Sequence, residues 1–141
     1  MYTLEELKTK IIEWANERDL IHSKNADKQR LKLIEECGEL ASAILKNDIA
    51  LQKDSLGDVF VVLTILEAQL GLKLDWSIEK HNKESFYHYM KAIIGSPINY
   101  AGYLFPLSEV INHDLTECAN LAYNEIKNRK GKTENGTFIK D

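Results

Sequence analysis

The chain has 141 residues, of which 44% are hydrophobic and 28% are charged, and its formal net charge is −4. This length predicts a single domain over residues 1–141 with one substantial core. The acidic balance argues against binding nucleic acid through its phosphate backbone. Two prolines and seven glycines favour long helices over a turn-rich β fold.

The sequence predicts no membrane association and a cytoplasmic location. No apolar run is long enough to span a bilayer, and the N-terminus lacks a signal-peptide pattern. Cys37 and Cys118 lie in helical patterns without a paired spacing. They are expected to be reduced core residues in a reducing compartment.

Apolar spacing and capping signals predict three helices in the first half of the chain. A capping box from Thr3 to Glu6 opens a helix that reaches about Asp19. The second helix is expected over residues 27–46. The third is expected over residues 49–70, ended by Gly71, and is apolar nearly all round, as in a helix buried within a bundle.

The second half predicts two further long helices and a hairpin. One helix is expected from a cap at Asp75 to Gly95, and another over residues 107–128. Between them, residues 96–106 are expected to be short or irregular and are interpreted as an insertion. An Asn135-Gly136 turn predicts a short hairpin in the C-terminal segment 127–141. The predicted fold class is all-α, a four-helix-type bundle with a C-terminal hairpin or extended tail.

Two groups of acidic residues occupy positions where a carboxylate needs a partner. Glu35, Glu36 and Glu39 fall within one arc of the second helix, beside its apolar stripe. Asp58 shares a face of the third helix with apolar residues, and Asp54 lies one turn earlier. Such carboxylates are costly unless they are paired or bind metal, and dense oxygen ligands suit Mg²⁺ or Mn²⁺. The alternative is a solvated acidic face.

Glu-Glu-x-x-Glu on one helix and Gly57-Asp58 on the next resemble the MazG-type all-α nucleoside triphosphate pyrophosphohydrolases. The resemblance covers residues 10–85 and returns at 115–140. The family carries an acid three residues before the final Asp, where this chain has Ser55. Asp54 is on the same helical face and is the candidate replacement.

The resemblance implies a metal-dependent enzyme that converts (d)NTP to (d)NMP and pyrophosphate. Glu36, Glu39, Asp58 and Asp54 would hold Mg²⁺, and Glu35 or Glu36 would act on the attacking water. Family members generally form homodimers or homotetramers, so a homo-oligomer is expected. House-cleaning of the nucleotide pool and phage nucleotide metabolism are both compatible roles.

Substrate contacts are expected mainly from the basic segment near the C-terminus, which resembles phage-type members of the family. The alternatives are a solvated tail for this segment, surface exposure for Lys80 and a core position for Trp14. Lys32 is expected to pair with Glu35 or Glu36. The candidate substrate-binding residues are Lys127, Asn128, Arg129, Lys130, Lys80 and Trp14. A second hypothesis is a non-catalytic helical module that senses nucleotides or binds a partner.

Overall fold

The computed structural model describes residues 1–77 and 84–141. Helices account for most of this part of the chain, and the two strands form one small antiparallel sheet. The elements, with 3₁₀ turns written η, are α1 (Leu4–Glu17), η1 (Ser23–Asn25), α2 (Ala26–Leu45), α3 (Ile49–Leu70), α4 (Phe86–Gly95), α5 (Pro97–Tyr100), η2 (Ala101–Tyr103), α6 (Leu104–Val110), α7 (Leu115–Ile126), β1 (Gly131–Glu134) and β2 (Thr137–Lys140).

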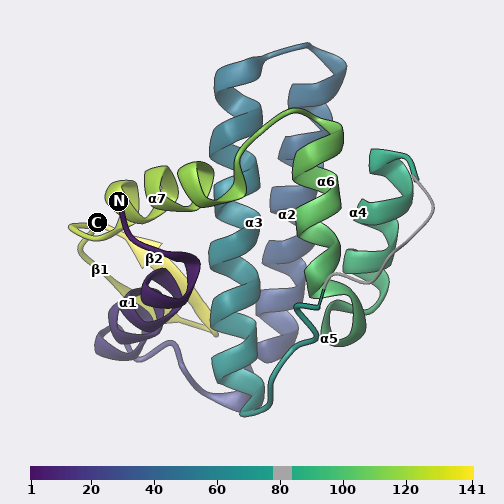
Figure 1. Cartoon of the computed structure of the whole chain (residues 1–141). Helices are drawn as coiled ribbons and strands as arrows, with labels where there is room; N and C mark the ends of the chain where they lie inside the picture. The colour runs from purple at the N-terminus through teal and green to yellow at the C-terminus, as the bar shows by residue number, and fades with distance from the viewer. Residues whose placement is uncertain (78–83) are drawn as a thin grey trace.

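The antiparallel helices α2 and α3 form the centre of the molecule (Figure 1). Helices α1 and α7 and the hairpin β1–β2 lie on one side of this pair, and α4, α5 and α6 lie on the other. The predicted all-α fold with a C-terminal hairpin is therefore confirmed. No helix in residues 1–77 or 84–141 is long and apolar enough to cross a membrane.

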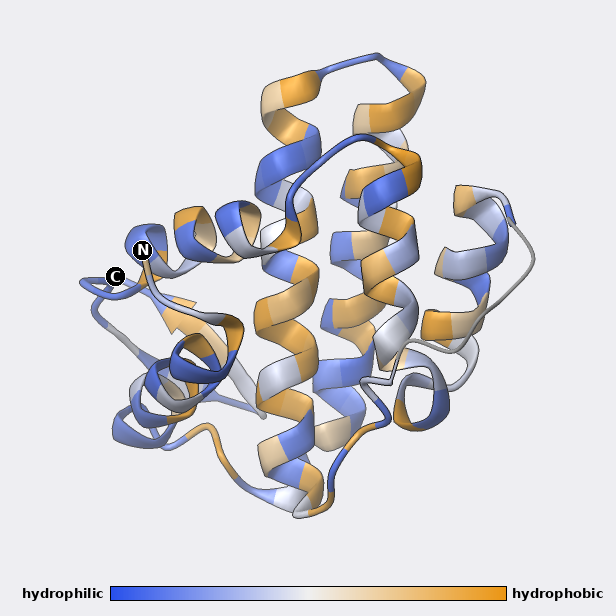
Figure 2. Cartoon of the chain, viewed as in Figure 1, coloured by the Kyte–Doolittle hydropathy of each residue, from blue (hydrophilic) through white to orange (hydrophobic). Residues whose placement is uncertain are grey.

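Helix α3 has the predicted bounds and is buried on nearly every side. The Asp48 carboxylate accepts a hydrogen bond from the Leu51 backbone N–H at 3.1 Å, and Gly71 ends the helix with φ of 66°. Figure 2 shows hydrophobic residues along most of the length of α3. Burial of this apolar surface is the main force that fixes α3 between the neighbouring helices.

Gly57 allows α7 to cross α3 at very short distance. A Cβ atom at this position would lie 2.2 Å from the carbonyl oxygen of Cys118 and 2.9 Å from the Cβ of Ala122. Only glycine fits such an approach. The crossing brings the following residue, Asp58, next to side chains carried by α7 and by the segment after it.

Two of the predicted helices have other bounds in the structure. Helix α4 begins at Phe86, capped by Ser85, and not at Asp75. The Asp75 carboxylate accepts a hydrogen bond from the Ser77 N–H at 2.9 Å, a local bond that competes with helix formation. Helix α4 does end at Gly95, as predicted, and the part of the predicted helix at residues 78–83 lies outside the described residues.

The predicted helix over residues 107–128 is divided into α6 and α7. Asn112 has φ of 60°, which ends α6, and the Asp114 carboxylate accepts from the Glu117 N–H to cap α7. Most of the segment 96–106 consists of the short pieces α5 and η2, as expected, but α6 already begins at Leu104 and not at Leu107. Asp114 and Glu117, an N-cap followed three residues later by a glutamate, mark the start of α7. Apolar periodicity alone does not reveal this helix start.

The C-terminal hairpin forms at the predicted turn and packs onto α1. Asn135 and Gly136 both have positive φ, 52° and 81°. The rings of Phe138 and Trp14 meet edge to face, with centroids 5.0 Å apart. A chain segment more than 110 residues from α1 in sequence thus closes one side of the molecule.

Candidate functional site

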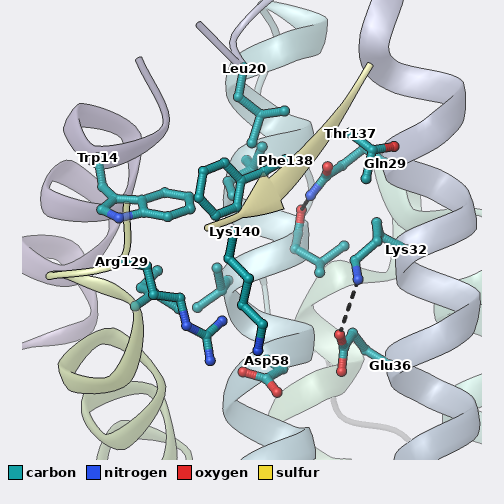
Figure 3. A pocket seen from close by; sticks show the side chains of 14 residues that line it. Trp14, Leu20, Gln29, Lys32, Glu36, Asp58, Arg129, Thr137, Phe138 and Lys140 are labelled. Atoms are coloured by element: carbon teal, nitrogen blue, oxygen red, sulfur yellow. Dashed lines mark hydrogen bonds and ion pairs between the residues drawn. The ribbon is translucent and has the colours of Figure 1, made fainter. Parts of the chain in front are cut away.

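A pocket of about 310 Å³ opens between the central helices, the segment after α7 and the hairpin. Its lining combines acidic, basic, aromatic and aliphatic side chains (Figure 3). The lining residues are Trp14, Leu20, Gln29, Lys32, Glu36, Asp58, Val61, Val62, Ile65, Ile126, Arg129, Thr137, Phe138 and Lys140.

Glu35, Glu36 and Glu39 form a carboxylate cluster on α2, with one oxygen of each within 4.8 Å of the others. Glu36 is 9% exposed and reaches the pocket. Its Oε2 atom is buried and accepts no hydrogen bond from the described residues. Lys32 pairs with Glu35 and lies 3.7 Å from the Oε1 atom of Glu36, so the predicted pairing of this lysine is confirmed.

Glu36 and Asp58 have raised pKa values, which burial and nearby carboxylates both cause. Burial raises the pKa of Glu36 to about 8, and the charges of Asp58 and Glu39 contribute. Burial also raises the pKa of Asp58 to about 7, with contributions from Glu125, Glu39 and Asp54, while Arg129 lowers it. Burial and like charge both favour the neutral acid.

These carboxylates fit a divalent cation. The unpartnered Glu36 oxygen supplies a free ligand atom, and the clustered carboxylates supply further oxygens of the kind that Mg²⁺ prefers. Burial and, to a smaller extent, neighbouring carboxylates raise the pKa values of Glu36 and Asp58, and a cation would stabilise the ionised form of both acids. Asp58 is not part of the α2 cluster, but it acts electrostatically on Glu36 from α3.

The basic side of the pocket comes from Arg129 and Lys140, whose side chains extend toward Asp58 (Figure 3). The Arg18 guanidinium fixes the backbone at Arg129. Its Nε and Nη2 atoms donate to the Arg129 carbonyl at 3.1 and 2.6 Å. The Arg18 carbonyl in turn accepts a hydrogen bond from the Thr133 hydroxyl at 2.7 Å, which holds the hairpin against α1.

Trp14 and Phe138 form the aromatic end of the pocket. Trp14 is 7% exposed, so it belongs to the core and lines the pocket as well. The Arg18 guanidinium lies over the Trp14 ring, with its Cζ atom 4.5 Å from the ring centroid. Flat aromatic surface beside cations and carboxylates is chemically suited to a ligand with a ring at one end and negative charge at the other.

The structure brings together only some of the residues proposed from sequence. Glu36, Asp58, Arg129 and Trp14 line the pocket, and Glu35 and Glu39 lie beside Glu36. Asp54 is exposed and does not line the pocket, although its charge raises the pKa of Asp58. The exposed residues Lys127, Asn128 and Lys130 do not line it either. Lys80 lies outside the described residues.

Sequence reasoning missed the pocket residues carried by β2, namely Thr137, Phe138 and Lys140. The predicted hairpin contained a signal for two of them. Alternate residues of a strand share a face, so Phe138 and Lys140 had to point the same way. What the sequence did not show was that this face covers the acidic helices.

Residues 24–86 match the family model described as the MazG nucleotide pyrophosphohydrolase domain. The resemblance based on the acidic motif is thereby confirmed over α2 and α3, and this segment is similar to a family of nucleotide pyrophosphohydrolases. It includes the carboxylate cluster and Asp58. It does not extend to α1, α7 or the hairpin, which supply Trp14, Arg129, Phe138 and Lys140.

A protein of Haemophilus phage HP1, described as an uncharacterized 18.2 kDa protein in the rep-hol intergenic region, is 45% identical over 69 residues. The match covers 49% of this chain and 42% of that protein, so it spans less than half of either length. No solved structure matches the chain significantly.

Proposed function

We propose that this chain, whose α2–α3 segment is of the MazG family, hydrolyses (d)NTP to (d)NMP and pyrophosphate with Mg²⁺ as cofactor. The observation that carries the proposal is the composition of one pocket. Glu36 and Asp58 lie at one end, Arg129 and Lys140 extend toward them, and Trp14 and Phe138 form an aromatic wall. A nucleotide needs a flat contact for its base and cations for its phosphates, and the metal needs oxygen ligands.

In this proposal Glu36, Glu39 and Asp58 hold Mg²⁺, with Glu35 and Asp54 adding negative charge nearby. The bound cation would neutralise the triphosphate and favour ionisation of water. Mn²⁺ is the other cation that suits oxygen ligands of this kind. The raised pKa values of Glu36 and Asp58 support the assignment, because they mark the carboxylates that a cation would stabilise most.

The chain's own residues would orient the substrate and accept the proton. Glu36 lines the pocket and has one oxygen without a partner among the described residues, whereas Glu35 is exposed, so Glu36 is the better placed base of the two. Water attacks the α-phosphorus, its proton passes to the Glu36 carboxylate, and the bond to the β-phosphate oxygen breaks. Arg129 would stabilise charge on the departing pyrophosphate.

The test is release of pyrophosphate from a panel of NTPs and dNTPs with Mg²⁺. The wild-type protein should turn over at least one of them, and Asp58→Asn should abolish turnover while circular dichroism still shows the helical fold. Nucleotide binding without turnover would instead support the second hypothesis, a module that senses nucleotides or binds a partner. The likeness to a phage protein supports a role in the nucleotide pool during phage infection.

We also propose that the protein forms a homodimer through an exposed apolar stripe on α2. Leu31, Ile34 and Leu45 are 59%, 50% and 87% exposed, and the α2–α3 hairpin extends beyond the other helices (Figure 1). The stripe is nearly symmetric about Gly38, so an antiparallel second copy of α2 would place Leu31 opposite Leu45. Light scattering should give twice the chain mass, and Ile34→Glu should give the monomer.

The proposed compartment is the cytoplasm, which the two buried free cysteines support. Cysteines without disulfide partners are typical of proteins kept under reducing conditions. Fractionation of cells that express the full chain would test this assignment. Recovery in the membrane or secreted fraction would contradict it.

A further inference from the structure

Strand β2 directs Lys140 into the pocket on the same face as Phe138. The two residues are separated by one position, and Gly131 is the register partner of Lys140 on β1. A Cβ atom at Gly131 would lie 2.8 Å from the Cα of Lys140 and 2.9 Å from the ring of Phe138. The glycine therefore leaves this face of the hairpin free for the aromatic ring and the lysine.

Lys140 forms no ion pair within the part of the chain that the structure describes. Lys32, on the opposite wall, pairs with Glu35 and Glu36. Among the described residues, Lys140 has no acidic partner within 4.0 Å, although its side chain extends toward Asp58 (Figure 3). The neighbouring Arg129 also lines the pocket and acts on Asp58 without such an ion pair.

The two cations face the buried Glu36 and the partly buried Asp58, and one bound group could satisfy both kinds of charge. An anion bound to a divalent cation would do so, because the metal side would meet Glu36 and Asp58 while the anionic side met the two basic residues. A chain of phosphates has the negative charge that both basic residues would meet and the oxygens that would bind the cation. The exposed Lys127 and Lys130 lie outside this volume.

We propose that Lys140 is a substrate-binding residue that contacts the phosphate chain of the nucleotide together with Arg129, so that the C-terminal hairpin is part of the phosphate site. The identification of the anion as a nucleotide phosphate chain rests on the proposed function. Loss of one charge-assisted contact of this kind lowers affinity by roughly 10- to 100-fold.

Lys140→Gln should weaken binding of inorganic triphosphate with Mg²⁺ by this factor in titration calorimetry. The matched control is Lys132→Gln, which removes the same charge from the same hairpin. Lys132 pairs with Ile139 across the sheet, so it points to the opposite face, where it lies 3.0 Å from Glu134. The control should bind triphosphate like the wild type, and Lys140→Arg should retain most of the affinity.

Binding and turnover separate this inference from the proposed function. If the wild type hydrolyses no NTP but its triphosphate affinity depends on Lys140, the proposed function fails and the phosphate contact stands. If the wild type hydrolyses NTPs while Lys140→Gln keeps its triphosphate affinity, kcat and KM, the phosphate contact is refuted. An equal loss in Lys140→Gln and Lys132→Gln would also refute it, since both would then act through the hairpin's stability. Absence of triphosphate binding by the wild type refutes it as well.

Discussion

Glu36→Gln should stabilise the metal-free protein at pH 8 and leave it nearly unchanged at pH 5. The pKa of Glu36 is raised from 4.5 to about 8 by burial and by the charges of Asp58 and Glu39. Between these values the native state binds more protons than the unfolded state, so the free energy of unfolding falls as pH rises. Glutamine has nearly the shape of the protonated acid and removes this titration.

The magnitude follows from the proton count. One proton bound only by the native state changes the free energy of unfolding by about 1.4 kcal/mol per pH unit. Three pH units would give about 4 kcal/mol if the site were rigid and dry. Access of water to the pocket reduces this, so we expect roughly 2 kcal/mol. For a chain of this size, that is an increase in Tm of about 4–8 °C.

The assay is thermal unfolding of wild type and Glu36→Gln at pH 5, 6, 7 and 8 in the presence of a chelator. Glu13→Gln, which removes an exposed carboxylate on α1, is the control for loss of charge. Saturating Mg²⁺ should raise the Tm of the wild type at pH 8 and have much less effect on Glu36→Gln. Parallel Tm curves for wild type and variant from pH 5 to pH 8 would refute the reasoning about Glu36.

Four further substitutions test the structure around the pocket. Gly57→Ala should lower the free energy of unfolding by at least about 1–3 kcal/mol in urea titration, because α7 must move off α3. Ser55→Ala should raise it by roughly 1 kcal/mol, because the buried Ser55 hydroxyl has no hydrogen-bond partner among the described residues. Arg18→Met should lower kcat/KM for NTP by roughly tenfold although Arg18 does not line the pocket, because its two bonds to the Arg129 carbonyl are lost. Asp54→Asn should reduce turnover much less than Asp58→Asn, because Asp54 is exposed; equal losses would show that Asp54 replaces the family acid absent at Ser55.

The starts of α1 and α3 were predicted at the right residue because local capping signals mark them. The Thr3 capping box and the Asp48 cap start α1 and α3 where predicted. The error at Asp75 had the opposite cause. A capping-type aspartate was interpreted as a helix start, but its carboxylate closes a short turn with Ser77 instead. The same residue type supports both structures, and only its surroundings in the folded chain decide between them.

The acidic half of the pocket was accessible from sequence because helical spacing fixes which side chains share a face. The position of the basic residues in the pocket could not be predicted in this way, because it depends on where separate elements meet in the fold. Apolar periodicity could not indicate that α6 and α7 are separated at Asn112, or that β2 would lie across from α2 and α3. The sequence did show a basic run near the C-terminus. Its exposed lysines do not line the pocket, whereas Lys140, which lies beyond this run, does.

The pocket therefore joins two halves with different origins in the chain. The segment that matches the MazG family model supplies the carboxylates of Glu36 and Asp58. Helix α1 and the C-terminal hairpin supply the aromatic wall, and Arg18 fixes both to the backbone of Arg129. In the proposed function, metal binding would depend on the first half, and contacts with the base would depend on the second. Since the second half lies outside the matched residues, the choice of nucleotide should change with substitutions at Trp14 and Phe138 while the requirement for metal does not.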